Sequence, residues 1–256
     1  MPDFAGQFVW YELITTDPAA ARSFYADVVG WQTRDVPMPG MTYILALAGE
    51  TQVAGLMAIP PEAAAMGTPP NWTGYVAVPD VDASAKQATS LGGQVLREPT
   101  DIPGVGRFAI VADPQGAVLA LFKGADGDGM TPNQAAPGHI GWHELYASEL
   151  ESAFGFYSAM FGWKKHQPMD IGPMGIYQLF GAEDPDIGGM MTKPEQMPAA
   201  AWLYYFNVGD IDAAASRITA GGGVIHNGPM EVPGPMWVLQ AQDPQGAWFA
   251  AVGTRG

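Results

Sequence analysis

Apolar and polar positions along the chain predict a short module that begins with a strand and a helix. Residues 8–15, FVWYELIT, are strand-like, and the Asp17 and Pro18 that follow suit a helix N-cap and a first helical position. The helix AAARSFYADVV ends before Gly30, and further strand-like runs follow, among them MTYILALAG and TQVAGLMAI. The predicted module is therefore one strand, one helix and three strands.

This module recurs along the chain. A second copy starts at WTGYVAV, where Asp80 or Asp82 is expected to cap a helix that ends at Gly92 and Gly93. The second half of the chain then repeats both modules: FVWYELITTD returns as IGWHELYASE, and DPQGAVLALF returns as DPQGAWFAAV. A tandem duplication of this kind sets the architecture before any single motif is considered.

The duplication predicts an α+β protein with two domains, residues 1–124 and 138–256, each built from two modules with curved mixed β-sheets. Residues 125–137 are rich in Gly, Pro, Asp and Asn and poor in large apolar side chains, which is typical of a linker. Because four modules in one chain can pair internally, a monomer or a homodimer is expected.

Charge and composition narrow the possible partners. Eleven Lys and Arg stand against 26 Asp and Glu, a formal net charge of −15 that disfavours nucleic acids and anionic membranes as partners. The chain has no cysteine, so a thiolate metal site and a thiol nucleophile are excluded. The N-terminal residues lack the pattern of a signal peptide, and no run of about 18 apolar residues occurs later, so a cytoplasmic location is expected.

The segments TTDPAAARSFYADVVGW and SELESAFGFYSAMFGW, with the DPQG turn before each final strand, resemble the vicinal oxygen chelate superfamily. This superfamily includes glyoxalase I, bleomycin-resistance proteins and extradiol dioxygenases, and the resemblance covers essentially the whole chain. It implies two tandem glyoxalase-like domains of paired βαβββ modules, in which the concave face of each sheet holds a ligand site.

The resemblance also implies a divalent metal held by His and Glu, but the corresponding positions carry no good ligand. These positions are Trp10 and Trp142, approximately Gly55 and Gly189, Thr73 and Leu203, and Ala120 and Ala250. Zinc, nickel, iron or manganese would need imidazole or carboxylate donors there. We therefore predict no cofactor and no metal residues, and keep as an alternative a divalent metal on a non-standard ligand set.

Strand alternation indicates which side chains line each concave face, because side chains two positions apart share a face. Glu12 then lies on the face of Trp10, and Glu144 on the face of Trp142, so that each face is aromatic and carries one carboxylate. The predicted ligand-binding residues are Trp10, Met57, Tyr75 and Arg107 in the first half, and Trp142, Met191, Tyr205 and Trp248 in the second.

Glu12 and Glu144 are the candidate catalytic residues. A carboxylate in an apolar, aromatic cavity has its charged form disfavoured, which suits it to general acid or base chemistry or to accepting a donor from a ligand. The competing interpretation is a hydrogen bond within the core that was copied with the repeat. Retention in both halves does not decide between them, because Leu13 and Leu145 are retained as well.

The remaining polar candidates are weaker. Arg107 has Trp237 as its counterpart and could grip an anion in one half only, although a lone strand arginine is more often a surface residue. His143 has Tyr11 as its counterpart and is expected on the helix side, as a core or interface residue. His139, His166 and His226 form no catalytic triad with it.

Three functions follow from this pattern. The first is a protein that binds a small, aromatic or otherwise apolar organic molecule without the usual metal. The second is an enzyme, either a glyoxalase-like lyase or isomerase that uses Glu12 or Glu144 as acid and base, or a dioxygenase-type enzyme with an unrecognised metal set. The third is an interaction scaffold in which the protein's own tryptophan side chains fill the concave face of each sheet.

Overall fold

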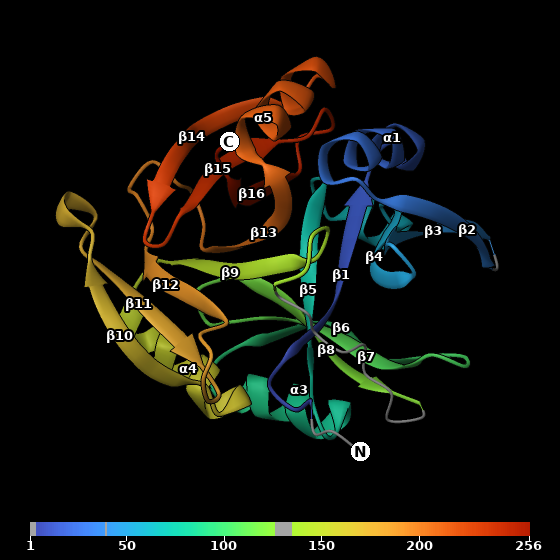
Figure 1. Cartoon of the computed structure of the whole chain (residues 1–256). Helices are drawn as coiled ribbons and strands as arrows, with labels where there is room; N and C mark the ends of the chain where they lie inside the picture. Colours follow the sequence, from blue (N-terminus) through green and yellow to red (C-terminus); the bar gives the residue numbers. More distant parts are fainter. Residues whose placement is uncertain (1–3, 39, 126–134) are drawn as a thin grey trace. The chain divides into compact units, whose positions relative to one another are not determined.

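A computed structural model describes residues 4–38, 40–125 and 135–256 of the 256-residue chain. It has the predicted order of four βαβββ modules in an α+β fold (Figure 1). Most of the predicted linker, residues 126–134, lies outside the described residues.

The first half holds two modules. The first consists of β1 (Phe8–Thr15), α1 (Pro18–Val29), β2 (Gln32–Met38), β3 (Met41–Ala48) and β4 (Thr51–Ala58), followed by the short helix α2 (Pro61–Ala65). The second consists of β5 (Asn71–Ala77), α3 (Val81–Ser90), β6 (Gln94–Ile102), β7 (Gly106–Ala112) and β8 (Val118–Gly124).

The second half repeats this order. Its first module is β9 (Ile140–Ala147), α4 (Leu150–Phe161), β10 (Lys164–Asp170), the 3-10 turn η1 (Gly172–Met174), β11 (Ile176–Gly181) and β12 (Gly188–Thr192). Its last module is β13 (Ala201–Asp210), α5 (Ile211–Ala220), β14 (Val224–Val232), β15 (Met236–Gln242) and β16 (Trp248–Thr254).

The helices begin and end where their capping residues indicate. The Asp17 carboxylate accepts hydrogen bonds from the amides of Ala19 and Ala20, at 3.1 and 3.0 Å, and Gly30 ends α1 with a φ of 87°. Of the two candidate caps of α3, Asp80 is the one used: its side chain accepts from the Ala83 amide. Asp82 lies in the first helical turn and is free to form the ion pair described below.

The strands form two eight-stranded mixed sheets, in the orders β2-β3-β4-β1-β5-β8-β7-β6 and β10-β11-β12-β9-β13-β16-β15-β14. β1 runs parallel to β4 and pairs Glu12 with Gly55, and β9 runs parallel to β12 and pairs Glu144 with Gly189. This register places each candidate glutamate directly beside a glycine at a position that was expected to be a vacated metal ligand.

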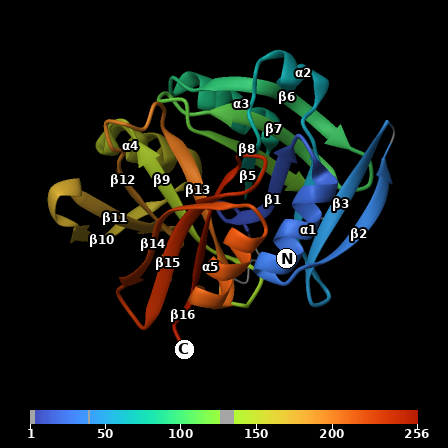
Figure 2. The same ribbon diagram turned by 90° about the horizontal axis from the view of Figure 1, so that it is seen from above.

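The described residues fall into two compact units, each with one module from either half. Unit 1 lies within residues 1–10, 73–132 and 142–202, and unit 2 within 11–72, 133–141 and 203–256. Within unit 1, α3 packs against α4, and within unit 2, α1 packs against α5 (Figures 1 and 2). The predicted domain boundaries at 124 and 138 follow the repeat and stay a prediction.

Each unit contains the same buried chain of hydrogen bonds. In unit 2, Trp72 Nε1 donates to Tyr25 Oη at 2.8 Å, and Tyr25 donates to Asp243 Oδ2 at 3.1 Å. Burial raises the pKa of the Asp243 carboxyl and of the Tyr25 hydroxyl. In unit 1, Trp202 donates to Tyr157 at 3.0 Å, and Tyr157 donates to Asp113, also at 3.0 Å.

The two aspartates are the first residues of the DPQG turns, and their other carboxylate oxygens cap the turn amides. Asp243 Oδ1 accepts from the amides of Gln245 and Ala247, both at 2.9 Å. Each DPQG turn is therefore tied to a helix from the other half of the chain. The aspartate that begins the turn makes the same contacts in both halves.

Candidate functional site

In unit 2, a glutamate and a tyrosine form a pair on top of a glycine. Tyr43, on β3, donates a hydrogen bond to Glu12 Oε2, on β1, at 2.9 Å. A Cβ atom added to Gly55, on β4 between them, would overlap the Tyr43 hydroxyl. Only glycine lets the phenol cross β4 to reach the carboxylate. Glu12 and Tyr43 are both half-buried.

Unit 1 contains the matching pair. Tyr177, on β11, is hydrogen-bonded to Glu144, on β9, and its hydroxyl also accepts a 2.7 Å hydrogen bond from Trp142 Nε1. A Cβ atom at Gly189 would overlap the Tyr177 ring. Desolvation first, and then the negative charge of Glu144, hold the pKa of the Tyr177 hydroxyl well above its usual value. Glu144 itself is only 6% exposed.

The two Glu–Tyr pairs bear on whether the side chains present could hold the divalent metal that the fold implies. The tyrosine rings fill the space into which a ligand side chain at Gly55 or Gly189 would project. Within the part of the chain that the structure describes, no three His, Asp or Glu side chains come together as a chelating site requires. The described side chains therefore do not fit a divalent ion held by His and Glu.

Trp10 stands at another of the vacated positions and packs within unit 1. It lies against the buried side chains of Tyr75, Phe108 and Ala120, and the rings of Tyr75 and Phe108 are 6.1 Å apart. The predicted ligand-binding residues Trp10 and Tyr75 thus belong to one aromatic cluster. Ala120, expected at the last ligand position, is fully buried in the same cluster.

The last module, in unit 2, has polar side chains at some of the equivalent positions. Gln240, the counterpart of Ile110, donates from Nε2 to Tyr205 Oη at 2.9 Å. Trp248 is 46% exposed, and its ring lies 4.4 Å from the ring of His226. The second modules of the two halves therefore differ at these positions: one has apolar and aromatic side chains, and the other has a hydrogen-bonded amide and an exposed indole.

Arg107 is already engaged by carboxylates. Its Nε and Nη2 atoms donate to Asp82 at 2.7 and 2.9 Å, and its Nη1 atom donates to Asp101 at 2.9 Å. These hydrogen bonds raise the pKa of the guanidinium further above its usual value. A ligand anion would have to displace one of the two carboxylates, so the contacts do not favour the predicted role of Arg107 in ligand binding.

His143 lies in the core, as expected from its strand position. Its ring is 1% exposed, stacks on Phe8 at 3.9 Å, and places Nδ1 2.6 Å from the Ile187 carbonyl oxygen. Burial lowers the pKa of His143 to about 4. The ring is thus neutral near pH 7 and serves packing in unit 1.

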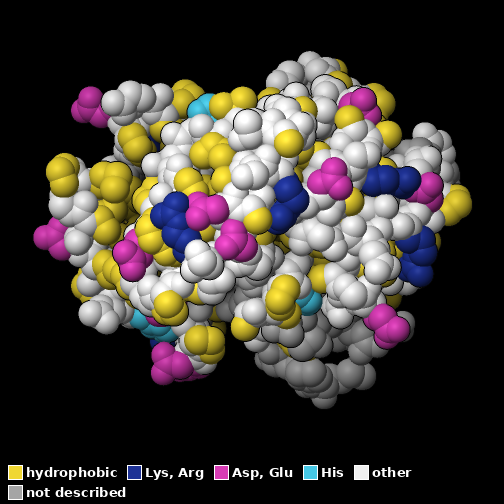
Figure 3. Space-filling model, turned by 45° about the horizontal axis from the view of Figure 1, so that its top comes forward, with side chains coloured by type: hydrophobic (Ala, Val, Ile, Leu, Met, Phe, Trp, Pro, Cys, Tyr) yellow, Lys and Arg dark blue, Asp and Glu magenta, His cyan; other side chains and the backbone are white. Residues whose placement is uncertain are grey.

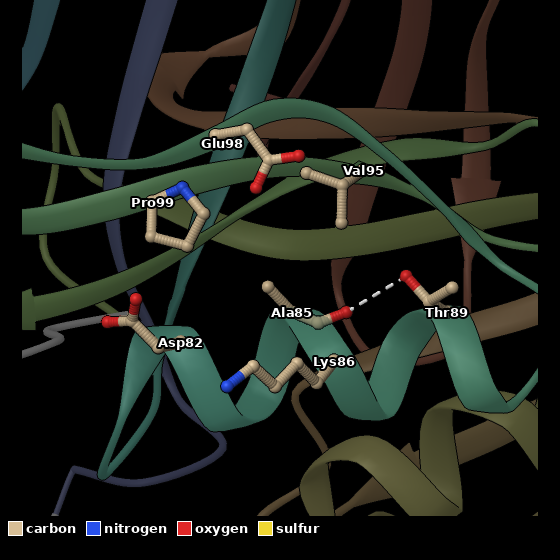
Figure 4. Close-up of a pocket in the computed structure, with 7 residues that line it drawn as sticks. All are labelled: Asp82, Ala85, Lys86, Thr89, Val95, Glu98 and Pro99. Atoms are coloured by element: carbon tan, nitrogen blue, oxygen red, sulfur yellow. Dashed lines mark hydrogen bonds between the residues drawn. The ribbon is translucent and has the colours of Figure 1, made fainter.

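A groove of about 380 Å³ lies between α3 and β6 in unit 1 (Figure 4). Ala85 and Lys86 lie on the helix, and Val95, Glu98 and Pro99 lie on the strand opposite. Its lining residues are Asp82, Ala85, Lys86, Thr89, Val95, Glu98 and Pro99, and they include none of the predicted site residues.

Acidic side chains accompany the basic ones on the surface. Figure 3 shows one face, on which Lys and Arg side chains lie beside Asp and Glu. Arg255, for example, is held by Asp212 at 2.7 Å and lies over the Trp237 ring, 4.1 Å from its centroid. Among residues 4–38, 40–125 and 135–256, no helix has the length and apolar character needed to cross a membrane.

The two tyrosines were missed by reasoning from the sequence. Glu12 and Glu144 could be found from strand alternation, but the tyrosines lie two strands away in sheet order. The available signal was the repeat: Tyr43 in MTYILALAG and Tyr177 in MGIYQLFG occupy matching places, and each precedes a glycine on the next strand.

Duplicated βαβββ modules in two mixed sheets define the class of this protein. The model of the Glyoxalase/Bleomycin resistance protein/Dioxygenase superfamily matches residues 7–121 and again residues 137–251. The chain belongs to this superfamily, as the resemblance in its sequence predicted.

Two relatives are similar over nearly their whole length. CFP32 of Mycobacterium bovis, provisionally named a glyoxylase, is 35% identical over 95% of this chain and 93% of its own. The anthracycline biosynthesis protein DauV of Streptomyces sp. strain C5 is 30% identical over 98% of this chain and 94% of its own.

Solved structures share the fold at low sequence identity. The Mn(II)-bound glyoxalase of Novosphingobium aromaticivorans has a TM-score of 0.67 at 16% identity, with 98% of this chain and 83% of the other covered. The 2,3-dioxygenase LapB of Pseudomonas sp. KL28 has a TM-score of 0.63 at 13% identity, with 96% and 91% covered.

Proposed function

We propose that this protein binds a small, aromatic or otherwise apolar organic molecule at a Glu–Tyr pair on a sheet face, without the usual metal ligands of its superfamily. The observation that carries the proposal is the placement of Glu12 and Tyr43 over Gly55, with the same arrangement at Glu144, Tyr177 and Gly189. A tyrosine ring and a carboxylate stand where the family places a chelating side chain.

The chemistry of this surface suits a planar ligand. Aromatic and methionine side chains offer apolar, polarisable faces for stacking, and a few polar groups fix the orientation of the bound molecule. Around Glu12, Ile14 and Met57 supply half-buried apolar surface on neighbouring parallel strands, where they are register partners. The carboxylate is the polar group that would orient the ligand.

Two relatives support an aromatic ligand. DauV of Streptomyces sp. strain C5 and DnrV of Streptomyces peucetius are both named anthracycline biosynthesis proteins, and each is 30% identical over 98% of this chain. Anthracyclines are planar fused-ring compounds, the type of molecule for which an aromatic surface with one acceptor is suited.

Binding and metal content test this proposal together. Isothermal titration with a fused-ring compound should give saturable binding to the protein purified without added metal. Elemental analysis of the same sample should give far less than one equivalent of iron, nickel, zinc or manganese. Stoichiometric metal would contradict the metal-free part of the proposal, and failure of every planar compound to bind would contradict the rest.

The hydrogen bond between Tyr43 and Glu12 also favours a second candidate, a glyoxalase-like isomerase. In this role Glu12 or Glu144 would take a proton from a carbon next to a carbonyl group and return it to the neighbouring position, so that substrate and product have the same atoms. The double variant E12Q/E144Q should then abolish turnover of a hydroxy-carbonyl substrate. Unchanged turnover in the double variant would eliminate acid–base chemistry at these residues.

A further inference from the structure

The groove between α3 and β6 in unit 1 combines apolar surface with two opposite charges. Ala85 on the helix and Val95 and Pro99 on the strand supply the apolar surface, and Lys86 and Glu98 carry the charges on exposed side chains (Figure 4). The volume of about 380 Å³ lies in the range of small-molecule pockets, roughly 300–1,000 Å³. The groove therefore suits a small ligand that has both apolar and charged parts.

Lys86 and Glu98 are not bonded to other side chains. Within the part of the chain that the structure describes, neither of them forms an ion pair or a side-chain hydrogen bond. Asp82, the other carboxylate of the groove, is held by Arg107 through hydrogen bonds of 2.7 and 2.9 Å. A ligand can therefore contact one cation and one anion without breaking an ion pair of the protein.

The equivalent positions in the second half keep the frame of the groove and lack both charges. Ser216 stands in place of Lys86, and Gly228 stands in place of Glu98. A Cβ atom at Gly228 would overlap the Val238 carbonyl oxygen, so a glutamate does not fit there. Four of the seven lining residues recur unchanged 130 positions later, as Asp212, Ala215, Thr219 and Pro229. Packing of the helix against the strand therefore does not require the two charges, which belong to the first half alone.

Opposite charges beside an apolar surface select a ligand that is a zwitterion. An ammonium group can donate hydrogen bonds to the Glu98 carboxylate, and a carboxylate can accept them from the Lys86 ammonium group. A ligand that is neutral overall also avoids repulsion by the formal net charge of −15. An apolar side chain on the same ligand can pack against Val95 and Pro99. An α-amino acid with an aliphatic side chain has all three parts.

We propose that the groove between α3 and β6 binds a free α-amino acid with an aliphatic side chain, through its carboxylate at Lys86 and its ammonium group at Glu98. The site shares no residue with the Glu–Tyr pairs and does not depend on the function proposed for them.

Three probes with the same branched side chain separate the two charges. L-Leucine carries both, isoamylamine lacks the carboxylate, and 4-methylpentanoate lacks the ammonium group. Titration of the wild-type protein, followed by amide NMR, should give saturable shifts on α3 and β6. We expect L-leucine to bind about threefold more tightly than either analogue, the size of effect that one exposed ion pair contributes.

Two single variants should each remove one of these preferences. Lys86→Ser, which introduces the residue of the second half, should bind L-leucine no more tightly than isoamylamine and still prefer it to 4-methylpentanoate. Glu98→Gln should show the reverse pattern. Lys123→Ser and Glu231→Gln remove the same charges from exposed side chains outside the groove, and these controls should keep both preferences.

Several results would overturn the proposal. These are the absence of saturable shifts on α3 and β6 in the wild type, and equal affinity of the wild type for all three probes. Retention of both preferences in Lys86→Ser or Glu98→Gln would have the same meaning, as would their loss in either control.

Discussion

Tyr25 Oη donates a 3.1 Å hydrogen bond to Asp243 Oδ2, and the two residues are 218 positions apart in the chain. The tyrosine lies on α1 in the first half, and the aspartate begins the DPQG turn of the second half. Tyr157 and Asp113 make the reciprocal bond in unit 1. Each of these residues belongs to a short local motif in the sequence. In the structure, their hydrogen bonds connect the two halves of the chain.

Removing the Tyr25 hydroxyl should lower the free energy of unfolding measurably. Tyr25→Phe leaves the Trp72 indole N–H and an oxygen of Asp243 without their partner in a buried site, which costs about 1–3 kcal/mol of unfolding free energy. Urea denaturation followed by tryptophan fluorescence would measure this loss. Ser23→Ala, on the exposed side of the same helix, is the control and should change stability by less than about 0.5 kcal/mol.

Because both halves contribute segments to each compact unit, we expect them to remain associated after the chain is cut in the linker. Each unit contains a module from residues before the linker and a module from residues after it. A protease site inserted within residues 125–137 should therefore give a nicked protein that elutes from gel filtration as one species with both fragments present. Elution of two separate fragments of about half the mass would show that each half is an independent domain.

The buried His143 predicts a loss of stability in mild acid. Its pKa is about 4 in the folded chain, against 6.5 for the free side chain, so between these values the unfolded state binds more protons than the folded state. The free energy of unfolding should then fall as the pH drops from about 6.5 to 4, by an amount on the order of 3 kcal/mol from this residue. Denaturation curves across this range measure the slope.

Substitution identifies the group responsible for this slope. His143→Phe should flatten the pH dependence between about 6.5 and 4, whatever its effect on stability at neutral pH. An equal slope in wild type and His143→Phe would place the acid sensitivity elsewhere.

Much of the fold could be predicted because its signals are local or repeated. Asp17 and Pro18 mark the start of a helix and Gly30 marks its end, each through its own chemistry. The duplicated motifs give the number of modules. Strand alternation likewise placed Glu12 and Glu144. The tyrosines that complete each pair depend on the register between strands, and the ion pair of Arg107 with Asp82 depends on the packing of a helix against a sheet. Neither relationship is encoded in local spacing.

The glycine beneath each pair provides the last prediction, a test of coupling between Gly55 and Tyr43. Gly55→Ala alone forces the Tyr43 ring away from Glu12, which should cost about 1–3 kcal/mol by overpacking and also break the hydrogen bond. In Tyr43→Ala the space is already empty, so adding Gly55→Ala should cost much less. A double-mutant cycle from urea denaturation should therefore give a coupling energy above about 1 kcal/mol. The same cycle with Gly189 and Tyr177 is its internal repeat, and additive losses in both cycles would mean that the tyrosines do not depend on the glycines.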